Sequence, residues 1–188
     1  MKKYLHVFYS QRGYTIVELL AVMTIVVVVS GVIAGILYST LRGGSKSKIT
    51  SDVAQNGNYA ISVITQTIIQ SQDVTSVGGT PITSCITSPT GTSIDLTQSD
   101  GSTITFSCSN NTVASTSAQI TSSLIDTSNL EVDATTCTFK CRQDNNNPVA
   151  IPVVDVAFSV KQKGSVTNPD AKSTANFSTS TSMRNYNP

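Results

Sequence analysis

The sequence predicts an α+β protein in which a long N-terminal helix packs, through its C-terminal half, on an antiparallel β-sheet head. Two observations carry this prediction. Residues 19–41 are apolar and contain no charged side chain, whereas residues 74–188 consist of short alternating runs separated by turn residues. We therefore expect two regions of different character within one chain of 188 residues.

The overall composition excludes several classes of protein. The net charge is +1 and only 12% of residues are charged, which does not fit a basic nucleic-acid-binding surface. The single histidine is His6, and no nucleophile motif or cluster of carboxylates is present. The sequence therefore predicts no catalytic residue, no metal and no cofactor, and we do not expect an enzyme.

The apolar segment is the first element. About 20 helical residues cross the roughly 30 Å hydrocarbon core of a bilayer, and residues 19–41 reach that length. Residues 25–29 are rich in β-branched side chains and also fit a buried strand, but the uninterrupted apolar length favours a membrane helix. Basic residues flank both ends of the segment in similar numbers, so their count does not set its orientation. The position of the segment near the N-terminus and the polar character of the residues after it favour a cytoplasmic N-terminus.

Helical periodicity continues beyond the apolar segment. We expect one helix from Tyr14 to about Gln72, whose second part, residues 42–73, hides one face. Gly43, Gly44 and Gly57 weaken this helix by about 1 kcal/mol each relative to alanine, and two helices with a short hinge are the alternative. The apolar residues of the hidden face recur about every 3.5 positions: Ile49, Val53, Ala60, Ile64 and Ile68.

The remaining residues, 74–188, predict strands. Residues 93–97 and 103–107 alternate apolar and polar side chains, and the Asp100-Gly101 dipeptide between them predicts a hairpin. A longer strand is expected over residues 149–160, where Pro152 marks an edge or a bend. Residues 175–181 predict the last strand. Polar loops are expected over residues 115–123 and 143–147.

Four cysteines follow the apolar segment: Cys85, Cys108, Cys137 and Cys141. An even number in an exported domain predicts disulfides, with three possible pairings. A straight strand would separate the Cα atoms of Cys137 and Cys141 by about 13 Å, whereas a disulfide needs roughly 4.4–6.8 Å. Either this segment turns and the cysteines pair sequentially, which we expect, or each pairs elsewhere. Zinc binding is the competing interpretation, but no Cys-x-x-Cys unit supports it.

The junction before the apolar helix contains Gly13, Tyr14 and Glu18. An acidic residue within a membrane helix costs about 2.5–3.5 kcal/mol at the centre and less near an end. One explanation is a carboxylate that reaches back to the headgroup region. The run GYTIVELLAVMTIVVVVSGVIAG, however, resembles the class III signal of type IV pilins and pseudopilins. That signal has a short basic leader ending in glycine, an aromatic residue, and a glutamate fifth in the mature chain.

The resemblance implies a pilin-like fold and a maturation pathway. A prepilin peptidase would cut between Gly13 and Tyr14 and then methylate the new amine of Tyr14. Residues 1–13 would be the leader, and residues 14–41 would remain as a single-pass anchor in the cytoplasmic membrane with an exported head. After assembly, this helix would form the core of an extracellular or periplasmic filament, with the amine of Tyr14 paired to Glu18 of a neighbour.

The resemblance also implies partners. These are the prepilin peptidase, other pilin or pseudopilin subunits and a membrane assembly platform; no specific nucleic acid is expected. Residues 177–185, which end in Arg184-Asn185, resemble the end of J-type minor pseudopilins and related minor pilins, and residues 120–124 and 129–132 resemble their middle region. This favours a minor subunit of a type IV pilus or type II secretion-like filament. A membrane-anchored binding module, such as an adhesin or DNA-uptake tip subunit, is the alternative.

Overall fold

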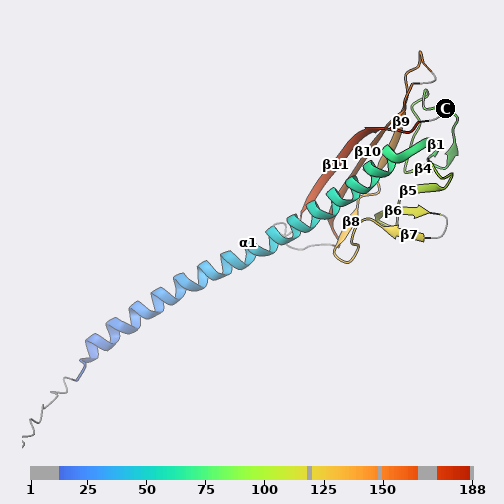
Figure 1. Ribbon diagram of the computed structural model, residues 1–188. Helices are drawn as coiled ribbons and strands as arrows, with labels where there is room; N and C mark the ends of the chain where they lie inside the picture. The colour runs from blue at the N-terminus through green and yellow to red at the C-terminus, as the bar shows by residue number, and fades with distance from the viewer. Residues whose placement is uncertain (1–12, 118–119, 148–149, 165–172, 187–188) are drawn as a thin grey trace, which may run out of the picture. The chain divides into compact units, whose positions relative to one another are not determined.

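The computed structural model describes residues 13–117, 120–147, 150–164 and 173–186. This part of the chain forms one helix and eleven strands, and a helix packed on antiparallel strands confirms the predicted α+β class (Figure 1). The bounds are α1 (Ile16–Gln70), β1 (Ser71–Val77), β2 (Thr80–Pro81), β3 (Thr90–Gly91), β4 (Ser93–Gln98), β5 (Thr103–Ser109), β6 (Thr112–Ser117), β7 (Ile120–Ser123), β8 (Leu130–Val132), β9 (Thr138–Arg142), β10 (Val153–Gln162) and β11 (Thr174–Ser182).

Helix α1 runs without a break through Gly43 and Gly44. The prediction of one long helix is therefore confirmed, and each end lies two residues inside the expected one. The chain divides into two compact units, residues 1–44 and 45–188, and α1 contributes to both. Every described residue of the first unit is exposed.

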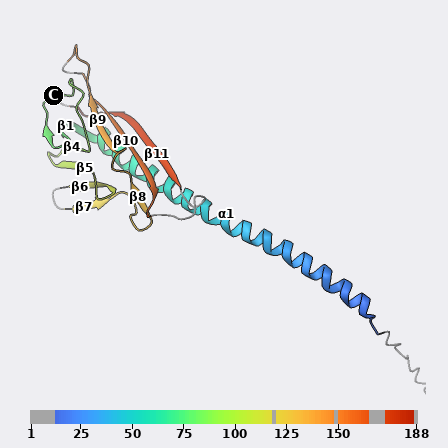
Figure 2. The same cartoon turned by 180° about the vertical axis from the view of Figure 1, so that it is seen from behind.

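In the second unit, one face of α1 is buried. Figures 1 and 2 show this part of the helix lying along β10 and β11. The face predicted from the periodicity is the one observed, and Ile49 packs at its beginning as a partly buried residue. The buried members are Val53, Gly57, Ala60, Ile64 and Ile68.

Two antiparallel sheets complete the second unit. The first has the strand order β2-β1-β4-β5-β6-β7, and the second has the order β11-β10-β9-β3, with β8 also paired to β10. The predicted hairpin is confirmed as β4 and β5, in which Thr97 lies opposite Thr103. Gly101 adopts a φ of +81° in its turn, a backbone conformation that glycine takes readily.

The prediction of a polar loop over residues 115–123 is wrong. This segment contributes to β6 and β7, which pair with Ser115 opposite Ser122; residues 118 and 119 lie outside the described residues. Strand β6 also pairs with β5 and buries Val113 and Ala114. Serine and threonine can continue a strand when its ladder is complete, and threonine favours it. The predicted loop at residues 143–147 is confirmed.

Strand β10 is shorter at its beginning than predicted. It starts at Val153, directly after Pro152, and Val149 lies outside the described residues. Because β10 is flanked by β9 and β11, a proline inside it would leave a ladder hydrogen bond unmade. The predicted last strand is confirmed as β11, which pairs with β10 over nine residue pairs in regular register.

Gly57 is a point of close approach rather than merely a weak point in the helix. A Cβ atom at this position would lie 2.1 Å from Cζ of Phe177 on β11. The Phe177 ring in turn stacks on Phe158 of β10, with 5.7 Å between ring centroids. The absent side chain of Gly57 therefore lets an aromatic ring of the sheet reach the helix backbone.

The disulfides join Cys85 to Cys141 and Cys108 to Cys137, with Cα separations of 5.3 and 6.2 Å. The predicted sequential pairing is wrong, because Cys137 directly precedes β9 and Cys141 lies on that strand. An extended segment holds these two residues too far apart for a shared disulfide. Cys108 on β5 instead links the first sheet to the start of β9. All four sulfurs are oxidised, which also removes the thiolates that zinc would require.

The segment after β11 closes the C-terminal end of α1. The backbone N–H of Arg184 donates to the carbonyl of Ile69 at 3.1 Å, and Asn185 Nδ2 donates to the carbonyl of Gln70 at 3.3 Å. The last turn of α1 contains no basic residue, so these contacts satisfy carbonyls that a helix end leaves open.

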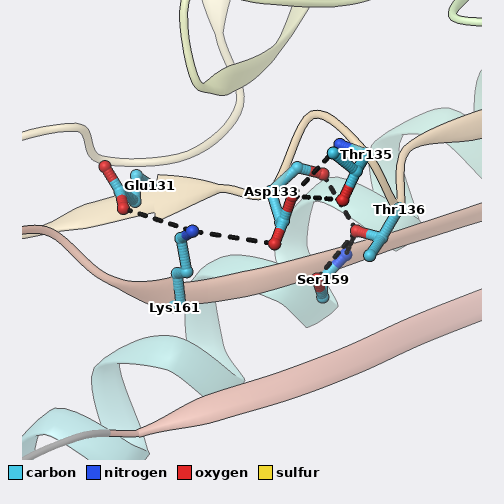
Figure 3. A network of polar contacts seen from close by, with 6 residues as sticks. All are labelled: Glu131, Asp133, Thr135, Thr136, Ser159 and Lys161. Carbon is cyan, nitrogen blue, oxygen red and sulfur yellow. Dashed lines mark hydrogen bonds and ion pairs between the residues drawn. The ribbon is translucent and has the colours of Figure 1, made fainter.

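A polar network holds the short strand β8 on β10 (Figure 3). Lys161 Nζ lies 3.5 Å from Glu131 Oε1 and 3.6 Å from Asp133 Oδ2. The hydroxyl and backbone N–H of Thr135 donate to Asp133 Oδ1, and these bonds, followed by the charge of Lys161, lower the pKa of Asp133. Together these contacts fix β8 and the turn that follows it.

Candidate functional site

The predicted site lies where α1 begins. Gly13 and Tyr14 precede the helix and are exposed, and Tyr14 exposes 80% of its surface. The helix starts at Ile16 because Thr15 caps it: Thr15 Oγ1 accepts the backbone N–H of Glu18 at 3.2 Å, and the Thr15 carbonyl accepts the N–H of Leu19. The bond between residues 13 and 14 therefore lies in accessible, non-helical backbone.

Glu18 occupies the first turn of α1. Its side chain has no hydrogen-bond or ion-pair partner among the described residues, and it is exposed. A carboxylate in a first turn interacts favourably with the partial positive charge at the helix N-terminus. Only the backbone of Glu18 takes part in the cap, so its carboxylate remains available for a cation from outside the chain.

Tyr14, which precedes α1, and Glu18, in its first turn, border the same hollow. With Leu19 and Val22 they line a shallow hollow at the start of the helix. The carboxylate of Glu18 therefore borders a hollow that is also lined by the tyrosine and by apolar side chains. The structure thus brings Tyr14 and Glu18 together, while the four cysteines lie in the second unit.

The apolar surface continues along α1. Large side chains from Ile16 to Leu41 are exposed, each over roughly half of its surface or more. Within the described residues, α1 is long and apolar enough to cross a membrane, by length and composition. None of this surface is covered by the described part of the chain.

Comparison with protein families decides what this segment is. Residues 9–37 match the prokaryotic N-terminal methylation motif. The chain carries a class III signal. Type IV pilins and pseudopilins share this signal, and the motif with its apolar helix indicates a membrane-anchored exported protein. No curated protein and no solved structure matches the chain.

Sequence reasoning missed the residue that caps the helix at this site, Thr15. Its role was readable from the pattern Thr15-x-x-Glu18, which is the spacing of a capping box. Among the described residues, no group of three or more His, Cys, Asp or Glu side chains could hold a metal ion. His6, Lys2, Lys3 and Arg12 lie outside the described residues.

Proposed function

We propose that this chain is the precursor of a type IV pilin-like structural subunit, of the minor pilin or pseudopilin type. Residues 1–13 are the leader, residues 14–41 the membrane and filament-core helix, residues 42–73 its amphipathic continuation and residues 74–188 the exported head. The observation that carries the proposal is an exposed Gly13–Tyr14 bond followed by an unpartnered Glu18 and an uncovered apolar helix.

Cleavage explains the position of Glu18. A cut after Gly13 creates an ammonium on Tyr14, which borders the same hollow as Glu18. When helices pack side by side in an apolar filament core, an isolated ammonium and an isolated carboxylate are each penalised by several kcal/mol. Pairing the amine of one subunit with Glu18 of the next removes both penalties and sets the register between subunits.

The proposed partners follow from this pathway. They are a prepilin peptidase at the cytoplasmic side, other pilin or pseudopilin subunits, and a membrane assembly platform. The ending Arg184-Asn185, which resembles that of J-type minor pseudopilins, supports the minor type, and its contacts close the helix in this chain. Before assembly, the subunit is a single-pass protein of the cytoplasmic membrane with an exported head.

The cleavage step is tested by co-expression with a prepilin peptidase. Mass spectrometry of the purified product is expected to show an N-terminus at N-methyl-Tyr14. Gly13→Leu is expected to leave the full precursor, because the branched side chain replaces the small residue at the cut. An intact leader in the wild-type product contradicts the proposal and favours the membrane-anchored binding module.

The assembly step is tested with a pair of variants. Glu18→Ala is expected to be cleaved normally but to form few or no filaments, as measured by shearing and immunoblotting against wild type. Thr15→Ala is the matched control, because it removes the helix cap and keeps the carboxylate. Wild-type filament levels in Glu18→Ala, or an equal loss in Thr15→Ala, contradict the pairing role.

A further inference from the structure

A cleft of about 230 Å³ with both polar and apolar lining residues lies at the beginning of the second unit. Lys48, Ile49 and Asp52 of α1 form one wall, and Leu130 of β8 forms part of the other, beside Asn129 and Gln162. The volume is far larger than a single water molecule needs. The cleft is separate from the processing site, which belongs to the first unit.

The wall opposite the helix is fixed before any ligand arrives. Leu130 lies opposite Gln162 in the antiparallel pairing of β8 with β10. One residue further along, Lys161 bridges Glu131 and Asp133 and holds β8 in place (Figure 3). The β8 wall of the cleft is therefore held by strand pairing and by the ion pairs of Lys161.

The charged groups of the helical wall have no partners. Lys48 and Asp52 are one turn apart on α1, yet neither side chain has an ion-pair or hydrogen-bond partner among the described residues. Gln162 Oε1 is a buried acceptor that also has no partner there. A ligand that pairs with both charged side chains presents an anionic group to Lys48 and a cationic donor to Asp52.

The cleft lies within a short length of chain from the apolar segment. Ser45, which also lines the cleft, follows Leu41 by four residues. Four residues reach at most about 14 Å even when fully extended. A bilayer carries a headgroup layer several ångströms thick outside its hydrocarbon core. If residues 14–41 cross the membrane, lipid headgroups are within reach of the cleft.

On the membrane anchoring that the proposed function contains, we propose that this cleft binds the headgroup of an amine-bearing phospholipid. The phosphate faces Lys48 and the hydroxyl of Ser45, and the primary ammonium faces Asp52. Ile49 and Leu130 contact the carbon linker between the two charges. A trimethylammonium headgroup has no N–H to donate, and a purely anionic headgroup leaves Asp52 without a partner.

The test compares phosphatidylethanolamine with phosphatidylcholine of the same acyl chains. Native mass spectrometry of the full chain, released from maltoside micelles that hold both lipids equally, reports the occupancy of each. We expect about tenfold higher occupancy by phosphatidylethanolamine, as one charge-assisted hydrogen bond provides. The mono- and dimethylated amines are expected to fall between them in order. Equal occupancy of the two lipids by the wild-type chain overturns the proposal.

Three variants locate the preference. Asp52→Asn is expected to abolish the preference for the primary amine, and Lys48→Gln to weaken the binding of both lipids. Lys46→Gln is the matched control, because it makes the same change of charge on the same helix and does not line the cleft. A preference for phosphatidylethanolamine that persists in Asp52→Asn overturns the proposal. The lipids with mono- and dimethylated amines test the same proposal on the wild-type chain, without any variant.

Two further outcomes concern the source of the ligand. Soluble O-phosphoethanolamine shares the headgroup chemistry, but the lipid is expected to bind at least about tenfold more tightly because its acyl chains hold it at the surface. Equal affinity of the lipid and of O-phosphoethanolamine overturns the proposal that the ligand is a lipid.

A lipid-free dimer that Asp52→Asn abolishes also overturns the proposal and assigns the cleft to a second copy. The uncleaved Gly13→Leu precursor is expected to keep the lipid preference. A failure of the maturation pathway therefore leaves this test of the cleft unaffected.

Discussion

The two parts of α1 are similarly helical but meet different surroundings. Ile25 in the first unit exposes 62% of its surface, whereas Ile64 and Ile68 in the second unit expose none. The second part is covered by the sheets of its own chain, and no described residue covers the first. Because burial of apolar surface is worth about 25 cal/mol per Å², exposure of the first part to water is unfavourable. The helix therefore contributes to the core of the second unit at one end and leaves its apolar side chains exposed at the other.

The largest difference between the two parts of α1 is expected when an isoleucine is shortened to alanine in each part. Ile64→Ala should lower the free energy of unfolding of the second unit by about 2–5 kcal/mol, because the side chain is fully buried. Ile25→Ala should change it by less than about 0.5 kcal/mol. Hydrogen exchange of the β10 amides in the full-length protein measures both. Equal losses in the two variants would contradict the division of the helix.

The disulfides should stabilise only the second unit, since residues 1–44 contain no cysteine. Replacing both Cys108 and Cys137 by serine is expected to cost about 3–4 kcal/mol, mainly by freeing the unfolded chain. Urea-dependent proteolysis of the second unit should shift to lower urea, and Cys85 should still pair with Cys141. An unchanged urea midpoint would show that the link between the sheets adds no stability.

Glycines in the two parts of α1 should respond with opposite signs. Gly57→Ala is expected to destabilise the second unit by about 1–3 kcal/mol, since the clash with Phe177 outweighs the roughly 1 kcal/mol gain in helix propensity. Gly44→Ala is the control, because nothing lies within 4 Å of its added Cβ. Phe177→Leu should recover part of the loss in a double-mutant cycle. Destabilisation that is independent of Phe177 would rule out the contact as its cause.

The smallest expected effect is the response of the second unit to acid. The pKa of Asp155 is lowered by its hydrogen bonds with Arg142 and then by Ser180. A lowered native pKa gives stability that is present above the ordinary value and is lost as pH falls through the native one. The melting temperature should therefore decrease between about pH 5 and pH 2.

Asp155→Asn should flatten this pH dependence. Asp73 acts with the opposite sign, because burial raises its pKa and its penalty is relieved as pH falls. Thermal unfolding of wild type and variant over the same pH series measures the difference. A slope that Asp155→Asn leaves unchanged would assign the acid response to other carboxylates.

The predicted site was readable from sequence because its signals are local. Gly13, Tyr14 and Glu18 lie within six consecutive residues, and the length of the apolar segment that follows can be counted directly in the sequence. The hidden face of α1 was also readable, because a helical period brings residues four apart onto one side. Thr15 belonged to the same local pattern and could have been found there.

The sequence alone thus determined the long helix, its two kinds of surface, the β4–β5 hairpin and the spacing of Gly13, Tyr14 and Glu18. Only the tertiary structure decided which cysteines meet, that residues 112–117 and 120–123 form strands, and that Gly57 receives the ring of Phe177. The cleft between Lys48 and Leu130 belongs to the same group. These features depend on residues far apart in the chain, and their contacts are set by packing and strand pairing that no local period encodes.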